Sequence, residues 1–211
     1  MASQSLILFA FIALFLVAVA FALLAARRQQ RKAVDNLTCL ASRLGFEVNR
    51  KPARFGFEAP PTVEGRYRDR PVQFFNYTTG SRKNRIYWSA VSANIGNDNG
   101  FTLELAPENF LTRIVTALGM QDITIGDPVF DRSFLIRSNN AAYAAAALLP
   151  EIRARLLSKR EQGSLGQLTV KAGVVRDAEI GAFDDAARVD RMAGMLEVIC
   201  DLAEVAEVYK A

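Results

Sequence analysis

The stretch LILFAFIALFLVAVAFALLAA, Leu6 to Ala26, decides the architecture of this chain, and the basic cluster RRQQRK follows it directly. Its 21 residues include no charge, proline or glycine. In a helix they span roughly 30 Å at about 1.5 Å per residue, which is the thickness of a bilayer's hydrocarbon core. Because a helix satisfies its own backbone hydrogen bonds, which lipid cannot do, the sequence predicts a transmembrane helix over residues 6–26, after a short tail at 1–5.

A cleaved signal peptide is the alternative interpretation of this segment. Ala18 to Ala20 offers a small-x-small cleavage site, but no Lys or Arg precedes the apolar run. The run is also longer than the roughly 7–15 apolar residues of a signal core. Basic residues beside a span stay preferentially in the cytoplasm. Here they are Arg27, Arg28, Arg31 and Lys32. We therefore expect a bacterial inner-membrane protein with one span, its N-terminus outside and its C-terminal domain in the cytoplasm.

The composition excludes several kinds of chemistry. Cys39 and Cys200 are far apart and form no CxxC pair, so nothing indicates a disulfide framework or a zinc site. The absence of histidine removes Ser-His-Asp and Cys-His catalysis and HExxH metal sites. The chain also has no GxxxxGK[ST] or GxGxxG phosphate-binding motif. We expect no metal, no cofactor and no enzymatic activity.

A carboxylate-dependent enzyme is the remaining catalytic hypothesis. Asp127 and Asp131 could bind a cation or act as acid and base. Structural roles are the simpler interpretation, because Asp127-Pro128 is typical of a turn and Asp131 is expected on the exposed face of a strand. Similarly, Asp184-Asp185 is expected to cap the last helix, and Trp88 to be a core or cross-strand aromatic residue.

Positive charge is concentrated in the first part of the chain. Residues 27–85 contain 14 Lys/Arg and 5 Asp/Glu, whereas residues 86–211 contain 12 and 17. Anionic headgroups attract nearby basic side chains by about 1 kcal/mol each. Candidate lipid-facing residues beyond the first cluster are Arg50, Lys51, Arg54, Arg66, Arg68, Arg82, Lys83 and Arg85. Alternatively, only the first cluster matters and the others are solvated. Nucleic acid is not an expected partner, because no known reading motif accompanies these residues.

The helix is expected to continue beyond the span as an amphipathic segment at 27–45. Its apolar stripe consists of Val34, Leu37, Leu40, Ala41 and Leu44, and Gly45 is a natural stop. We expect this stripe to pack on the domain's own sheet, since it covers barely two heptads of a coiled coil.

For residues 46–211 the sequence pattern predicts one cytoplasmic α+β domain, in which helices pack on an antiparallel sheet. A boundary between two smaller units near 119–128 is the alternative. The expected strands are Thr62–Arg68, Pro71–Thr78, Asn84–Ile95, Phe101–Leu105, Phe130–Ser138, Gln167–Ala172 and Val174–Ile180. Turns are expected at Asp69-Arg70 and at Gly96–Gly100, where GNDNG indicates a hairpin turn and lacks the order of an EF-hand calcium loop. The expected helices run from Pro107 to Leu118, from about Asn140 with a restart or kink at Pro150, and from Asp184 to Tyr209.

The segment from Gly126 to about Tyr209 resembles a broad group of uncharacterised bacterial proteins with a single-pass membrane anchor. The pattern is a turn with Asp, a strand of the form FDxxFxVxS, an Ala-rich helix and an L-x-P-x-x-x-x-x-L segment. The corresponding residues are Asp127, Phe130, Asp131, Phe134, Ile136, Ser138, Leu149, Pro150 and Leu156. The resemblance implies the fold and the membrane context, and it assigns no reaction.

These observations together predict a non-enzymatic accessory subunit. We expect it to join other subunits of a bacterial membrane complex, which could be respiratory, photosynthetic or a transport assembly, and to contact the lipid bilayer. The anchor contains no GxxxG motif, so a tight glycine-mediated helix contact is not expected. A peripheral module that binds anionic lipids is the first alternative, and the carboxylate-dependent enzyme is the second.

Overall fold

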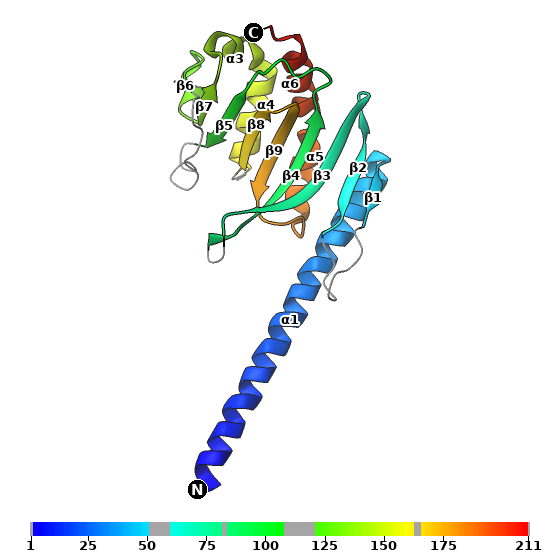
Figure 1. Ribbon diagram of the computed structural model, residues 1–211, viewed down its shortest axis with the longest axis vertical. Coiled ribbons are helices and arrows are strands. Elements are labelled where there is room, and N and C mark those ends of the chain that lie inside the picture. The colour runs from blue at the N-terminus through cyan, green and yellow to red at the C-terminus, as the bar shows by residue number, and fades with distance from the viewer. Residues whose placement is uncertain (1, 51–59, 82–83, 108–120, 163–165, 211) are drawn as a thin grey trace.

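The computed structural model describes residues 2–50, 60–81, 84–107, 121–162 and 166–210, and within these ranges nine strands form one antiparallel sheet. The strand order is β1-β2-β3-β4-β9-β8-β5-β7-β6 (Figure 1). The strands are β1 (Glu47–Asn49), β2 (Thr62–Tyr67), β3 (Arg70–Thr79), β4 (Ile86–Asn94), β5 (Leu103–Pro107), β6 (Gln121–Ile123), β7 (Phe134–Ser138), β8 (Gly166–Lys171) and β9 (Val174–Ile180). The helices are α1 (Ala2–Leu44), α2 (Pro128–Asp131), α3 (Ala141–Ala147), α4 (Pro150–Glu161), α5 (Ala186–Gly194) and α6 (Leu196–Val208).

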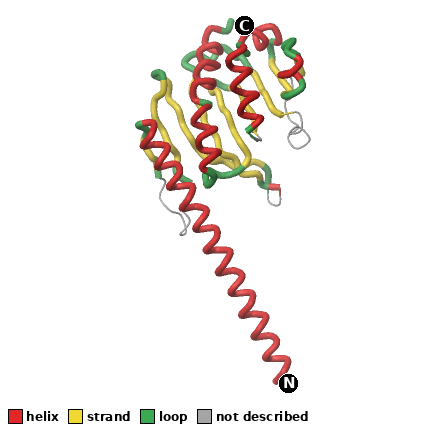
Figure 2. The backbone as a smooth tube through the Cα atoms, turned by 180° about the vertical axis from the view of Figure 1, so that it is seen from behind, coloured by secondary structure: helices red, strands yellow, loops and turns green. Residues whose placement is uncertain are grey.

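The arrangement confirms the α+β prediction. Helices α4, α5 and α6 cover one face of the sheet, and the C-terminal part of α1 packs on the same face beside β1 and β2 (Figures 1 and 2). One buried cluster extends from Ala33 to Tyr209 and includes residues on both sides of the conceivable boundary at 119–128. The described residues therefore share one principal core.

Helix α1 is a single continuous element of 43 residues, about 65 Å long at 1.5 Å per residue. It passes through the expected boundary between residues 26 and 27 without a break, and it already includes Ala2 of the expected tail. Its C-terminal stripe packs as predicted, because Leu37, Leu40 and Ala41 are buried in the principal core. The helix ends before Gly45, whose φ of +69° is the left-handed conformation of a glycine stop.

Two tight turns with positive φ connect neighbouring strands among the described residues. The β2–β3 turn lies at Arg68 and Asp69, both with positive φ, one residue earlier than expected. The β8–β9 hairpin turns at Ala172-Gly173 and lies between β4 and β5 in the sheet. The hairpin prediction for Gly96–Gly100 is therefore wrong: this segment crosses over the hairpin, because β4 pairs with β3 and β9 whereas β5 pairs with β7 and β8.

Two further predictions need correction. The strand expected at Phe130–Ser138 begins only at Phe134, because Asp127 and Pro128 start the short helix α2 instead. The helix expected from Asp184 to Tyr209 breaks at Met195 into α5 and α6. Gly194 ends α5, since glycine is a poor helix former, and the buried Met195 joins the two helices.

The other elements follow the predictions closely. Asn140 caps α3, and Pro150 starts α4 as a separate helix. The short edge strands β1 and β6 were not predicted. The helix expected from Pro107 to Leu118 lies outside the described residues except for Pro107, which ends β5.

Candidate membrane-proximal site

The loop at 181–185, which follows β9, joins the domain to α1. Asn36 donates a hydrogen bond from Nδ2 to the carbonyl of Phe183 at 2.8 Å, and Gln29 donates from Nε2 to Asp184 at 2.7 Å. The Phe183 ring is fully buried and meets Phe74 of β3 edge-on, with ring centroids 6.4 Å apart. Polar bonds and a buried ring thus fix the helix to this end of the sheet.

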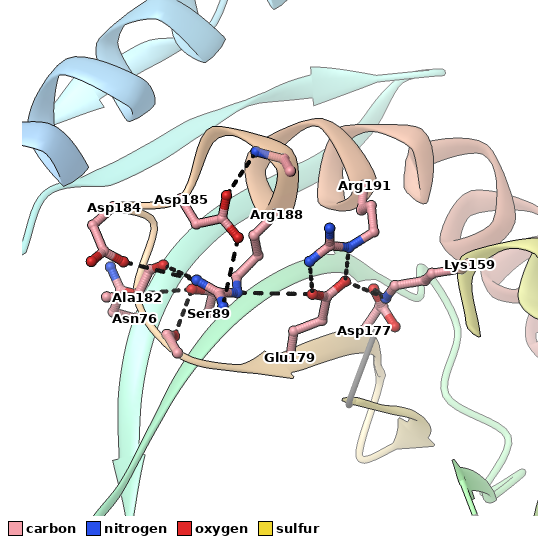
Figure 3. Close-up of polar contacts among 12 residues, drawn as sticks. Asn76, Ser89, Lys159, Asp177, Glu179, Ala182, Asp184, Asp185, Arg188 and Arg191 are labelled. Atoms are coloured by element: carbon pink, nitrogen blue, oxygen red, sulfur yellow. Dashed lines mark hydrogen bonds and ion pairs between the residues drawn. The ribbon is translucent and has the colours of Figure 1, made fainter. Parts of the chain in front are cut away.

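A network of buried charged side chains on β9, α4 and α5 adjoins this loop. Figure 3 shows Glu179 between Arg191 on one side and Lys159 on the other. Arg191 donates to both carboxylate oxygens of Glu179, at 2.9 and 3.3 Å. Lys159 Nζ bonds Asp177 and lies 3.4 Å from Glu179. Since Lys159, Asp177 and Glu179 are all buried, the network ties α4 and α5 to β9 inside the domain.

Arg188 extends the network to the loop itself. Its guanidinium donates to the carbonyl of Ala182 and lies 3.8 Å from both Glu179 and Asp184 (Figure 3). Gly181 has a φ of +117°, and a Cβ atom there would lie only 2.6 Å from Nη2 of Arg188. The positive φ, which few residues other than glycine adopt, explains why glycine occupies the position. Asp185 caps α5 as predicted, by accepting a hydrogen bond from the amide of Ala187.

The electrostatics of the network indicate a structural role. Burial raises the pKa of the Asp177 carboxyl, and the neighbouring Lys159 acts in the opposite direction. Each of the two buried carboxylates has a basic side chain within hydrogen-bonding distance. Such an arrangement stabilises the packing of two helices on a strand. Within the described ranges, no group of three or more Cys, Asp or Glu side chains could hold a metal ion.

A groove of about 490 Å³ lies below this junction, between α1 and the loop at 181–185. It is apolar at one end and charged at the other. Its lining residues are Phe21, Leu24, Ala25, Arg28, Gln29, Lys32 and Asp184. Two of the four basic residues that were predicted to set the topology therefore line the groove.

The structure separates the other predicted basic residues. Arg50 and Arg85 are exposed. Arg66 near the end of β2 and Arg68 in the β2–β3 turn lie at the end of the sheet remote from the N-terminus of α1 (Figure 1). Arg66 donates to the carbonyl of Asp69, and Arg68 forms an ion pair with Asp201 at 2.5 Å. Lys51, Arg54, Arg82 and Lys83 lie outside the described residues.

Both carboxylates of the catalytic hypothesis have structural partners. Asp127 accepts hydrogen bonds from the amides of Val129 and Phe130 as the cap of α2, and these bonds lower the pKa of its carboxyl. Asp131 was expected on a strand, but it lies in α2 and accepts from the amides of Ile125 and Gly126. The two side chains therefore hold the chain around α2.

Trp88 is a cross-strand aromatic residue, as predicted. Its ring stacks on Tyr77 of the neighbouring strand, with centroids 5.9 Å apart and planes within 5°. Its Nε1 donates to Thr79 at 2.8 Å, and the side chain is buried.

Comparison with known proteins supports the fold. No protein-family model and no curated protein sequence matches the chain. A solved structure, the crystal structure of the mycobacterial trehalose monomycolate transport factor A, TtfA, is similar with a TM-score of 0.56. It is 11% identical, and the match covers 83% of this chain and 94% of that chain. Within the described residues, α1 is the one helix that is long and apolar enough to cross a membrane.

Proposed function

We propose that this protein is a membrane-anchored, non-enzymatic accessory subunit of a bacterial inner-membrane complex. The anchor is the apolar part of α1, and the domain at its C-terminal end binds another subunit on the cytoplasmic side. The observation that carries the proposal is the continuity of α1. Phe21 in the apolar run is 74% exposed, whereas Leu37, sixteen residues along the same helix, is fully buried in the domain core.

Continuity matters because it fixes the domain's position. A flexible linker lets a domain search a volume, whereas an unbroken helix sets both the height and the rotation of the domain relative to the bilayer. The hydrogen bonds of Gln29 and Asn36 to the loop at 181–185 reinforce this rigid connection. A fixed orientation suits a subunit that presents one surface to a neighbouring membrane protein.

The structural neighbour favours one of the three candidate assemblies. Its name describes a transport factor, and it shares this fold over most of both chains. Among respiratory, photosynthetic and transport complexes, we therefore propose a transport assembly. The bonds that Asp127 and Asp131 make to backbone amides support the non-enzymatic part of the proposal.

Purification of the tagged full-length protein in a mild detergent tests the proposal. We expect an integral membrane protein to co-purify in a fixed ratio. Recovery of a lone monomer would overturn the accessory role.

A helix insertion tests the role of orientation. One alanine inserted between Ala26 and Arg27 turns the domain by about 100° relative to the span and lengthens the helix by about 1.5 Å. We expect the recovery of the partner to fall at least tenfold. The matched control is one alanine inserted after Ser5, before the apolar run, and it should leave recovery unchanged. Equal recovery from both variants would contradict the fixed orientation.

A further inference from the structure

We propose that the groove between α1 and Asp184 binds one anionic phospholipid from the leaflet that faces the domain. The inference rests on the membrane anchor of the proposed function, but it does not depend on the partner subunit. The lipid's phosphodiester would contact Arg28 and Lys32, and part of one acyl chain would lie along Phe21, Leu24 and Ala25.

The order of the lining residues matches the order of groups in a phospholipid. Phe21, Leu24 and Ala25 lie at the end of the apolar run, where the hydrocarbon region ends. Arg28 follows Ala25 by about 4.5 Å along the helix axis, and Lys32 follows it by about 10 Å. The groove therefore changes from apolar to cationic along the direction in which a lipid changes from acyl chain to phosphate.

The two cations of the groove, Arg28 and Lys32, are exposed and therefore available to a ligand from outside the domain. Many basic residues of the domain have an acidic partner within 3 Å, such as Arg43 with Asp190 and Arg70 with Glu207. Among the described residues, neither Arg28 nor Lys32 has an ion-pair partner within 4 Å. Arginine and lysine are the side chains that most often bind phosphate, arginine in a bidentate manner.

Asp184 limits the charge of the ligand. Its carboxylate accepts the hydrogen bond from Gln29 and lies 3.8 Å from Arg188, so it is already part of the junction. Two cations and one carboxylate give the groove a net charge of +1 from its lining side chains. That charge matches a lipid with a net charge of −1, such as phosphatidylglycerol.

Native mass spectrometry of the delipidated full-length protein in detergent tests the site. Phosphatidylglycerol and phosphatidylcholine with the same acyl chains are the probes. We expect one phosphatidylglycerol to bind at least tenfold more tightly than phosphatidylcholine. No bound phosphatidylglycerol, or equal affinity for the two lipids, would overturn the proposal.

A pair of double variants separates a site from a general basic flank. Arg28→Gln with Lys32→Gln removes both groove cations, and we expect at least a tenfold loss of phosphatidylglycerol affinity, because the phosphodiester loses its charge-assisted hydrogen bonds to both side chains. Arg27→Gln with Arg31→Gln removes the same charge from the same flank, at residues that do not line the groove. This control should change the affinity less than twofold. An equal loss in both pairs would show that the basic flank attracts the lipid non-specifically and that the groove is not a binding site.

Membrane retention distinguishes failure of this inference from failure of the proposed function. Wild-type protein that washes out of membranes at alkaline pH has no anchor, and both proposals would then be overturned. If the protein stays in the membrane and recovers its partner but binds no phosphatidylglycerol, the lipid site is overturned and the proposed function is not.

Discussion

Replacing Lys159 with methionine should lower the free energy of unfolding by about 3 kcal/mol at neutral pH. The Lys159 side chain is 8% exposed and its partner Asp177 is 3% exposed. Methionine preserves most of the aliphatic volume, so the loss comes mainly from a buried carboxylate without its cation. Breaking a buried ion pair in this way costs about 3–5 kcal/mol. The lower end applies because Arg191 still neutralises Glu179 through two hydrogen bonds.

The loss should depend on pH in a defined direction. Burial already raises the pKa of Asp177, and removal of Lys159 removes the main opposing influence. A carboxyl whose pKa is higher in the folded state than in the unfolded state destabilises the fold when it is ionised. The deficit of the variant should therefore shrink as the pH falls through the raised pKa of Asp177. The double variant Lys159→Met with Asp177→Asn should recover most of the loss at neutral pH.

Urea unfolding of the full-length chain in mild detergent measures this effect. Trp88 is the single tryptophan and is buried, so its emission should shift to longer wavelength on unfolding. Lys171→Met, at an exposed lysine that ends β8, is the matched control and should change stability by less than about 0.5 kcal/mol. A loss below 1 kcal/mol for Lys159→Met, or a deficit independent of pH, would refute the reasoning.

Two further predictions concern the ends of the sheet. Hydrogen bonds from Arg70 lower the pKa of Glu207 to about 2, so we expect about 1–2 kcal/mol of stability, after allowance for solvent screening, to be lost as the pH falls from about 5 to 2. Acid titration of the Arg70→Gln variant should lack this component, and an unchanged acid midpoint would count against it. Gly181→Ala should lower the free energy of unfolding by about 2 kcal/mol, because a side chain there has an unfavourable φ and meets Arg188. Thermal unfolding of Gly181→Ala in the wild-type protein and in an Arg188→Ala background would check this, and equal losses in the two backgrounds would show that the contact with Arg188 is unimportant.

Local patterns predicted most of the elements because local interactions determine them. The stripe of Leu37, Leu40 and Ala41 has helical spacing, and those residues are buried. The β8–β9 hairpin follows from two alternating segments around Ala172-Gly173, a turn that requires positive φ. The Asp127–Pro128 pair is typical of a turn, but Asp is also a preferred N-cap and Pro a preferred first residue of a helix, and in the structure the pair starts α2.

The order of strands could not be predicted in the same way. Pairing of β4 with β9 joins Ala90 to Ala178, and no local pattern encodes a contact over that separation. One signal for the charge network was present in β9. Val175, Asp177 and Glu179 occupy every second position of β9, so their side chains lie on the same face of the sheet. Because Val175 is buried in the core, both acidic side chains also lie on the face that the helices cover. Two carboxylates on that face require cations from the covering helices, which Lys159 and Arg191 provide.

The described basic residues of the first part of the chain lie in several parts of the domain, so a charge count alone does not define a membrane-facing surface. The first part of the chain carries 14 basic residues, but Arg68 and Arg70 lie at or beside the turn remote from the span and are neutralised by acidic residues of α6. Residues close in sequence to the apolar run need not be close to it in space, because β2 runs away from it (Figure 1). Arg28 and Lys32 lie at the end of the apolar run, and neither has an acidic partner among the described residues. A specific lipid contact is therefore expected at the groove that these two side chains line, rather than over the whole basic part of the domain.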